Sequence, residues 1–279
     1  MPSRSLAMYE HNSKAGNQGD VVKHAALVAA VDSLLALDRA RFFVYADCFA
    51  GSAHYPLIPG SGWAKGIGKL PSTVTESANK HVAQWRSMWP QGKSLVGASY
   101  PGSSAIVCQL VAARRMKWHA HLWDISPSAI ASLRAAFAVE DATVHGCPVS
   151  AGDVHSCTPT FVLVDPPGPR TAGKPHYPSA RGVVEMTFGT EHAMIWMPII
   201  ASGTGSPVPE IPATVETREV FLEAGLSVTT VRWSAGPQTC GCRVAFKASD
   251  DILRAARDSI DAVVELMPWS TEATHESPA

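Results

Sequence analysis

Residues 161–168 read Phe-Val-Leu-Val-Asp-Pro-Pro-Gly, and this stretch decides how the chain is interpreted. Four apolar residues in a row are typical of a strand that is buried inside a sheet. The two prolines lack the N–H that a sheet needs, so the strand ends at Asp165 and its end is held rigidly. Ligands bind at the carboxyl ends of strands in open α/β sheets. Asp165 is therefore a candidate catalytic residue.

The composition indicates a globular protein with a sizeable core. Of the 279 residues, 46% are hydrophobic and 17% are charged, and 23 Lys and Arg balance 24 Asp and Glu. This is not the strongly basic balance of a protein that holds nucleic acid mainly through phosphates, although a local basic groove is compatible with it. No apolar run reaches the roughly 18 residues of a membrane span, and the polar N-terminus does not resemble a signal peptide. We expect a cytoplasmic protein that binds no membrane, with reduced cysteines and no metal site.

Strand and helix patterns alternate along the chain. Apolar residues at helical spacing predict helices, and short apolar runs that end in an acid or a proline predict strands. The expected helices cover residues 20–37, 77–88, 103–117, 126–137, 214–224 and 250–267. The expected strands cover residues 42–47, 119–124, 143–146, 161–164, 193–197, 227–233 and 242–248. This alternation predicts an α/β fold with a seven-stranded Rossmann-like sheet whose last two strands form an antiparallel pair.

The segment 56–97 differs in character from the rest of the chain. Gly, Pro, Trp and Lys are frequent there, and the only clear pattern is the helix expected over 77–88. We therefore expect a small helical insertion over 56–97 within a main domain formed by residues 1–55 and 98–268. Residues 269–279 are expected to form a flexible tail.

Two further segments have the residue types of a site for a ligand that carries a ribose and a carboxylate. Asp47 to Ala53 follow the first strand, and glycine in this turn lets the backbone and the next helix N-terminus approach the carboxylate. Asp124 follows the second strand, where an acid can accept hydrogen bonds from two ribose hydroxyls. Each segment also has an ordinary explanation. Asp47 to Ala53 can be a common turn of small residues, and Asp124 can be a solvated charge at a strand end. Their order along the chain, with Asp165 third, favours a binding site.

These segments, with others, resemble one family, the bacterial methyltransferases that modify the exocyclic amine of an adenine in large-subunit (23S) ribosomal RNA. The resemblance extends from about residue 8 to residue 248. The N-terminal and Tyr-Pro-Gly-Ser segments are specific to this family, whereas methyltransferases that act on other amino nitrogens share the Asp-Pro-Pro turn. The matching residues are Tyr9-Glu-His11, Ala15-Gly-Asn17, Asp20-Val-Val-Lys-His24, Asp47 to Tyr55, Tyr100-Pro-Gly-Ser103, Asp124 with Pro127-Ser128, Val164-Asp-Pro-Pro167, and Ala193 to Ile199 with Trp196 and Pro198.

The resemblance implies a class I methyltransferase fold and S-adenosyl-L-methionine as the methyl donor. The residues that it places at the donor are Lys23, His24, Ser103, Asp124 and Asp153. From the turn after the first strand, Asp47, Phe49 and Gly51 are further candidates for donor binding. It also implies that Tyr9 borders the acceptor pocket beside the catalytic Asp165. From the residues alone, His24 is more often a structural histidine, Lys23 a solvated lysine and Tyr9 an ordinary loop residue.

The chemistry expected at Asp165 follows from the weak nucleophilicity of an aromatic amine, whose lone pair is delocalised. Asp165 or the carbonyl of Pro166 can accept hydrogen bonds from the amine, which makes the nitrogen pyramidal and frees its lone pair. The alternative is that Asp-Pro-Pro only terminates a strand. The position of Asp165 at the strand end favours catalysis.

The chain departs from the family at several positions. Gly168 stands where the family has an aromatic residue, which removes a surface for stacking a flipped base. A histidine, a glycine, an arginine and a basic residue of the family are replaced by Phe49, Ala53, His54 and Glu10. These departures favour a small-molecule amine as the acceptor, with 23S rRNA as the alternative. A non-catalytic interaction protein on the same fold is the third hypothesis. We expect a monomer or a homodimer.

Overall fold

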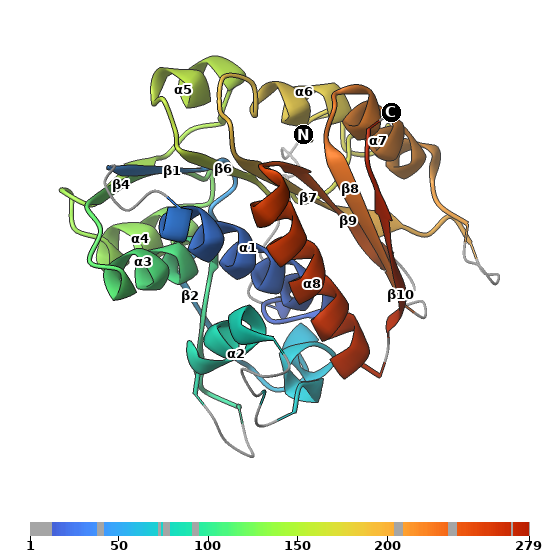
Figure 1. Ribbon diagram of the computed structural model, residues 1–279, viewed down its shortest axis with the longest axis horizontal. Helices are drawn as coiled ribbons and strands as arrows, with labels where there is room; N and C mark the ends of the chain where they lie inside the picture. The colour runs from blue at the N-terminus through green and yellow to red at the C-terminus, as the bar shows by residue number, and fades with distance from the viewer. Residues whose placement is uncertain are drawn as a thin grey trace, which may run out of the picture.

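The structure, a computed structural model, describes residues 13–37, 42–71, 74, 79–90, 95–203, 209–233, 239–268 and 270–278 (Figure 1). The α-helices are α1 Gln18–Leu37, α2 Lys80–Ser87, α3 Ser103–Ala113, α4 Pro127–Ala136, α5 Ala151–Ser156, α6 Ala180–Glu185, α7 Pro212–Glu223 and α8 Asp250–Leu266. Short 3-10 helices are η2 Gly62–Ala64 and η3 Ile67–Lys69. The strands are β1 Phe43–Asp47, β2 His54–Pro56, β3 Ser99–Pro101, β4 Trp118–Trp123, β5 Ala142–His145, β6 Phe161–Val164, β7 Ala193–Ile200, β8 Ser227–Trp233, β9 Thr239–Lys247 and β10 Ser270–Glu276.

The main sheet has the strand order β10-β8-β9-β7-β6-β1-β4-β5. The strands from β7 to β5 in this order pair in parallel, while β9 is antiparallel to both β7 and β8. The chain moves outward from β1 to β4 and β5, and then returns to β6 on the other side of β1. This reversal is the topological switch point at which open α/β sheets bind ligands. The expected α/β class is confirmed.

Helices cover both faces of this sheet (Figure 1). Helices α1, α3, α4 and α8 contribute to one hydrophobic cluster, and α5, α6 and α7 contribute to a second cluster on the opposite face. Helix α1 is buried almost all round, because it packs against α2, α3 and α8 as well as the sheet. A helix that is apolar on all sides lies in the interior of a protein. The few polar side chains on α1 are therefore carried into the interior.

Residues that were expected to form a flexible tail instead form β10, which makes an eight-stranded sheet rather than the expected seven. β10 pairs antiparallel with β8. Ion pairs also hold it, since Arg218 contacts Glu276 and His275 Nε2 lies 3.0 Å from Asp261 Oδ1. A strand held by main-chain pairing and charges has no strong apolar alternation, so the sequence did not reveal it.

Strand β7 runs through Pro198, where the sequence suggested that the strand would stop. β7 pairs with β6 only from Ala193 to Ile195, whereas its pairing with β9 extends to Ile200. Proline cannot donate to a ladder and is tolerated where one side of a strand has no neighbour. Pro198 lies beyond the pairing with β6, and the strand therefore continues past it.

The insertion is bounded by a small antiparallel pair formed by β2 and β3. Helix α2 starts at Lys80 because the side chain of Asn79 accepts hydrogen bonds from two N–H groups of its first turn. The expected start at Ser77 lies outside the described residues, and the limits at 56 and 97 remain a prediction. Within the described part of the chain, no helix combines the length and the apolar character that crossing a membrane requires.

Candidate functional site

Three carboxylates lie at the carboxyl edge of the sheet, each at the end of a parallel strand. Asp47 ends β1, Asp124 follows β4, and Asp165 follows β6 with the buried Pro166 after it. β1 lies between β6 and β4, so these residues come from three neighbouring strands at the switch point. The structure thus brings together the acids that the sequence singled out, in the place where α/β folds bind ligands.

Lys23 of α1 reaches Asp165 from the helix that covers one face of the sheet. Its Nζ lies 2.6 Å from Asp165 Oδ2 and 2.9 Å from Asp20 Oδ1. Burial by itself would lower the pKa of Lys23, but the two carboxylates raise it well above its ordinary value. Lys23 is only 5% exposed, which excludes a solvated lysine. It is a buried cation that fixes the position of Asp165.

Trp196 of β7 packs beside this ion pair. The centroid of its ring lies 5.8 Å from Lys23 Nζ. A Cβ on Gly19 would come within 2.6 Å of the same ring, so glycine at this position allows α1 to approach β7 closely. The contact joins α1, β6 and β7 around Asp165.

Asp47 is completely buried and has different surroundings from Asp165. Its carboxylate accepts hydrogen bonds from Tyr45 Oη at 2.8 Å and from the Phe49 N–H at 3.4 Å. Burial raises the pKa of Asp47 to about 7, although the hydrogen bond from Tyr45 opposes the rise. Asp47 is therefore partly protonated at neutral pH. It shapes the start of the turn after β1, where the predicted donor contact Phe49 is half-buried.

Gly51 and Asp124 join the turn after β1 to the end of β4. Gly51 has a φ of +61°, and a Cβ there would lie 2.2 Å from Tyr55 Oη, so the turn requires glycine. The Gly51 N–H donates to Asp124 Oδ2 at 2.9 Å, and the Ser126 N–H donates to Oδ1 at 2.7 Å. Each carboxylate oxygen can accept more than one hydrogen bond, so this arrangement is compatible with a ribose contact.

His24 connects α1 to the start of α3. Its Nδ1 lies 2.6 Å from Tyr100 Oη, and its Nε2 lies 3.3 Å from Ser103 Oγ. The preceding Gly102 packs closely on the turn after β1, because a Cβ there would lie 2.3 Å from Ser52 O. The N-terminus of α3 is thereby held against that turn, where its N–H groups are suited to an anionic ligand.

The remaining predicted residues are less closely connected with this group. Asp153 lies in the first turn of α5, where it forms a capping box with Ser150 and is exposed. The residue at the end of β5 is instead His145, which stacks on Trp123 with ring centroids 4.4 Å apart. Tyr9 lies outside the described residues. Roles for Asp153 and Tyr9 at the site therefore remain predictions.

Sequence reasoning missed three residues that the structure places here. Asp20, expected only to begin α1, is the second carboxylate at Lys23 and also accepts a hydrogen bond from the Gly16 N–H at 2.8 Å. Tyr45 lies inside β1 and donates to Asp47. Ile125, next to Asp124, is an apolar side chain that is 58% exposed. Polar residues inside apolar elements, and an apolar residue after a strand-end acid, are the signals that could have revealed them.

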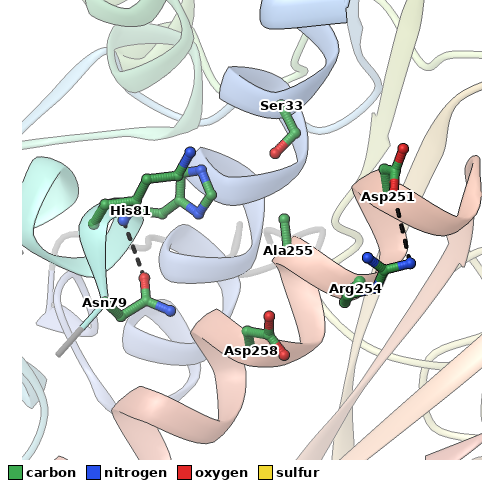
Figure 2. Close-up of a pocket in the computed structure, with 8 residues that line it drawn as sticks. Ser33, Asn79, His81, Asp251, Arg254, Ala255 and Asp258 are labelled. Carbon is green, nitrogen blue, oxygen red and sulfur yellow. Dashed lines mark hydrogen bonds and ion pairs between the residues drawn. The ribbon is translucent and has the colours of Figure 1, made fainter. Parts of the chain in front are cut away.

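A groove of about 350 Å³ lies elsewhere, between α1, α2 and α8 (Figure 2). Polar and charged side chains line it, including those of His81, Asp251, Arg254 and Asp258. Arg254 pairs with Asp251 at 3.5 Å on the α8 side. None of the residues predicted for the site lines this groove, so it is separate from the switch point.

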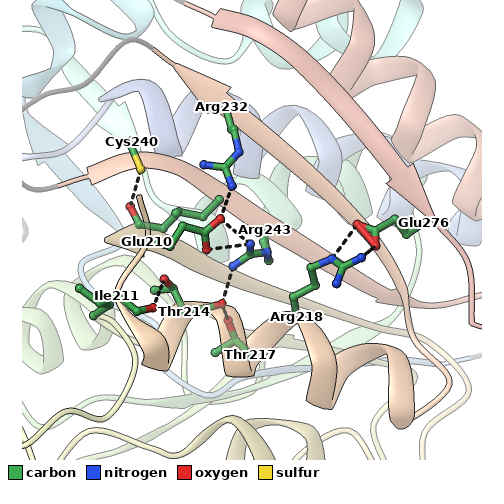
Figure 3. A network of polar contacts seen from close by, with 10 residues as sticks. Glu210, Ile211, Thr214, Thr217, Arg218, Arg232, Cys240, Arg243 and Glu276 are labelled. Atoms are coloured by element: carbon green, nitrogen blue, oxygen red, sulfur yellow. Dashed lines mark hydrogen bonds and ion pairs between the residues drawn. The ribbon is translucent and has the colours of Figure 1, made fainter. Parts of the chain in front are cut away.

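A second ionic network lies between the antiparallel half of the sheet and helix α7 (Figure 3). Glu210 pairs with Arg232 and, at 2.8 Å, with Arg243, which also donates to the carbonyl of Thr214 in α7. Burial would raise the pKa of Glu210, but the two guanidinium groups hold it below its ordinary value. This network joins β8 and β9 to the start of α7.

Comparisons with known proteins reveal relatives of the chain. It is 27% identical over 210 residues to the ribosomal RNA large subunit methyltransferase J of Haemophilus influenzae, across 70% of this chain and 71% of that protein. Its fold matches the crystal structure of protein LPL1258 from Legionella pneumophila with a TM-score of 0.72 and 13% identity, over 95% of this chain and 98% of that chain. No protein-family model matches the chain. The resemblance found in the sequence is confirmed, and the chain is an S-adenosyl-L-methionine-dependent methyltransferase, a divergent relative of methyltransferase J.

Proposed function

We propose that this protein methylates the exocyclic amine of an adenine in large-subunit (23S) ribosomal RNA, with Asp165 as the catalytic residue. The observation that carries the proposal is the ion pair of Lys23 with Asp165, which fixes a carboxylate at the switch point of the sheet. The relative from Haemophilus influenzae is named for ribosomal RNA of the large subunit. This supports RNA as the acceptor over the small-molecule amine that the composition and Gly168 favoured.

The residues at the switch point fit S-adenosyl-L-methionine as the donor. The N-terminus of α3, which begins at Ser103 and lies against the turn after β1, is suited to the donor's carboxylate. Asp124 is suited to the ribose hydroxyls, and the exposed Ile125 beside it offers an apolar surface to the adenine ring. The bound donor supplies an electrophilic methyl group. Asp47, Phe49 and Gly51 shape the turn against which it lies.

Asp165 acts on the acceptor amine by hydrogen bonding. It accepts an N–H of the amine, directs the nitrogen lone pair toward the methyl group and stabilises the positive charge that develops on nitrogen. Lys23 holds the carboxylate in position from the opposite side, at 2.6 Å, so little reorganisation is needed as the reaction proceeds. The Pro166 carbonyl is the second candidate acceptor of an amine proton. The methylated nitrogen then releases one proton.

A local basic surface adjoins the site, although the net charge is close to zero. It consists of the exposed lysines Lys14, Lys65 and Lys69. They lie on two segments that touch at the start of α1, where the Ile67 N–H donates to the Gly16 carbonyl at 2.9 Å. Gly16 in turn donates to Asp20, the partner of Lys23. Lysines so placed are suited to RNA phosphates on either side of a target base.

Transfer of a labelled methyl group to unmodified 23S rRNA tests the proposal. We expect methylation of a single adenine, identified by nuclease digestion and mass spectrometry. Replacing Lys14, Lys65 and Lys69 together by alanine should reduce the slope of log affinity against log salt by about 0.7–0.9 for each phosphate that is no longer neutralised. Lys117→Ala, an exposed lysine before β4 at the opposite edge of the sheet, is the matched control. Donor binding without any transfer to RNA would contradict the RNA acceptor and favour a small-molecule amine.

A further inference from the structure

Gly168, the residue after the two prolines, has a backbone conformation that side-chain-bearing residues rarely adopt. Its φ is +151°. A Cβ built there would lie 3.7 and 3.8 Å from two ring carbons of Tyr177 and 3.9 Å from Pro198 Cγ. The space into which a side chain at position 168 would extend is therefore already bordered by the ring of Tyr177. Gly168 is the position at which the family resemblance predicted an aromatic residue.

Tyr177 is a buried residue that lies outside the two large hydrophobic clusters. It is 8% exposed and belongs to neither of the clusters that line the sheet. Exposed residues of its own segment cover it instead. His176 meets the ring edge-on with centroids 4.8 Å apart, and Lys174 Nζ lies 4.9 Å from the ring centroid. The ring thus lies beside the Asp-Pro-Pro turn with exposed polar neighbours on it.

The backbone of this segment fixes the place of the ring. Arg170 donates from Nε to the Tyr177 carbonyl at 2.7 Å and from its N–H to the Pro178 carbonyl at 3.2 Å. The Tyr177 N–H donates to the Lys174 carbonyl at 3.2 Å. Directly afterwards, Ser179 caps α6. The segment is anchored to α6 on one side and to the Asp-Pro-Pro turn on the other, which are the conditions for a preorganised contact.

We propose that Tyr177 is a specificity-determining residue that supplies the aromatic surface beside Asp165 against which a planar amino heterocycle lies. The inference rests on the proposed function, since it assigns a residue to the acceptor side of the same site. An amine attached to a flat ring must present one edge to Asp165, and an adjacent aromatic face fixes the plane of that ring. The ammonium of Lys174 moves off the face of Tyr177 and meets an anionic group of the acceptor.

This assignment gives Gly168 a different meaning. The glycine does not leave the acceptor side without an aromatic ring, because the ring comes from nine residues later in the chain, on the segment that leads to α6. A Cβ at 168 would lie in ordinary van der Waals contact with that ring, and a side chain there would strain the backbone, whose φ is +151°. Gly168 and Tyr177 are therefore neighbours, and the backbone conformation at 168 favours a residue without a side chain.

Steady-state kinetics of Tyr177→Leu and Tyr177→Phe test the inference, with an unmodified 23S rRNA fragment as the acceptor. Leu keeps the apolar bulk without the aromatic face, and Phe keeps the face. We expect Tyr177→Leu to raise KM for the RNA by about 10- to 100-fold, the range for removing one base-stacking interaction. Tyr177→Phe should stay within about threefold of the wild type, and neither variant should change donor affinity measured by calorimetry.

Three results would overturn the inference. The first is an unchanged KM in Tyr177→Leu while the wild type methylates the RNA, which leaves the proposed function intact. The second is a parallel loss of donor affinity and thermal stability in Tyr177→Leu, which would make the ring structural. If the wild type transfers no methyl group to RNA, the proposed function fails. Binding of adenosine to the donor-loaded variants then decides, and equal affinity of the Leu and Phe variants overturns the inference as well.

Discussion

Two ionic networks among the described residues, one around Lys23 and one around Glu210, have similar chemistry and different surroundings. Around Lys23 one cation holds two carboxylates, whereas around Glu210 one carboxylate holds two guanidinium groups. The first network lies where the chain reverses between β1 and β6, and the second lies on the antiparallel half of the sheet, between β8, β9 and α7. A buried ion pair therefore does not by itself indicate catalysis. The place of the first network, at the chain reversal where open α/β sheets bind ligands, is what supports the proposed role of Asp165.

The largest effect should follow from Asp165→Ala. This change removes the carboxylate that we propose meets the amine, and it leaves Lys23 with Asp20 as its partner. We expect turnover to fall at least about 10²- to 10³-fold, the range for removing one group that stabilises charge in a transition state. Donor affinity should remain nearly unchanged. Single-turnover transfer and donor calorimetry measure the two quantities, and retained turnover would sink the catalytic assignment.

Glu210→Gln should affect stability and spare catalysis. The change removes the charge that pairs with the buried Arg243 and with Arg232, whose side chain is 31% exposed. Breaking a buried pair in this way lowers the free energy of unfolding by about 3–5 kcal/mol. Urea denaturation measures the loss in the free energy of unfolding. At low temperature the turnover of the variant should equal that of the wild type. Arg218→Ala, which breaks the more exposed pair with Glu276, is the control and should cost only about 0–1 kcal/mol. A variant that folds normally but is inactive would show that the second network also serves the site.

Asp47→Asn should change how stability depends on pH. Because burial raises the pKa of Asp47 to about 7, the folded state holds its proton more tightly than the unfolded state does. Below about pH 4 the raised pKa of Asp47 does not change the free energy of unfolding. Between about pH 4 and pH 7 it lowers the free energy of unfolding increasingly, and above about pH 7 the loss is complete. At roughly 1.4 kcal/mol per pKa unit, the full effect is a few kcal/mol.

The asparagine keeps an oxygen that can accept the hydrogen bond from Tyr45 Oη, and it has no carboxyl group that titrates. Denaturation across this pH range should therefore show a smaller fall in stability for Asp47→Asn than for the wild type. Identical pH profiles would show that Asp47 titrates normally in the fold.

The smallest effect should come from Asp124→Ala. It removes the acceptor that joins Gly51 to the end of β4, together with the proposed ribose contact. We expect donor binding to weaken by about 1–3 kcal/mol, the range for losing a charged hydrogen-bond partner. Calorimetry measures the change, with Asp153→Ala as the comparison because Asp153 is an exposed capping residue of α5. An equal loss in both variants would place Asp153 at the donor as well, as the family resemblance implied.

Much of the sheet, and the acids of the candidate site that follow its strands, could be predicted from the sequence, because the patterns that indicate them lie within short segments. An apolar run that ends in an acid marks β6 with Asp165, and the same signal marks β4 with Asp124. The order of such runs along the chain predicts a parallel sheet, and the sheet brings the strand ends together. The acids at the switch point therefore follow from pattern alone.

The rest of the site depends on contacts between distant parts of the chain. Lys23 and Asp165 are 142 residues apart in the sequence, and nothing near either of them announces the pair. Arg114 at the end of α3 shows the same difficulty, because its partner Asp32 of α1, 2.7 Å away, lies 82 residues from it in the sequence. The pairing of Gly168 with Tyr177 likewise depends on how a loop folds back, which turn chemistry alone does not specify.

Strand β10 has a consequence for how the protein behaves in concentrated solution. It occupies the hydrogen-bonding edge of β8 along most of that strand, from Trp233 to Val228. An uncovered edge of this length is a template on which a second chain can pair. A chain cut before Ser270 would retain the switch point but expose that edge, and it should form oligomers that size-exclusion chromatography detects. The last strand therefore protects the enzyme from aggregation, a task unrelated to methyl transfer.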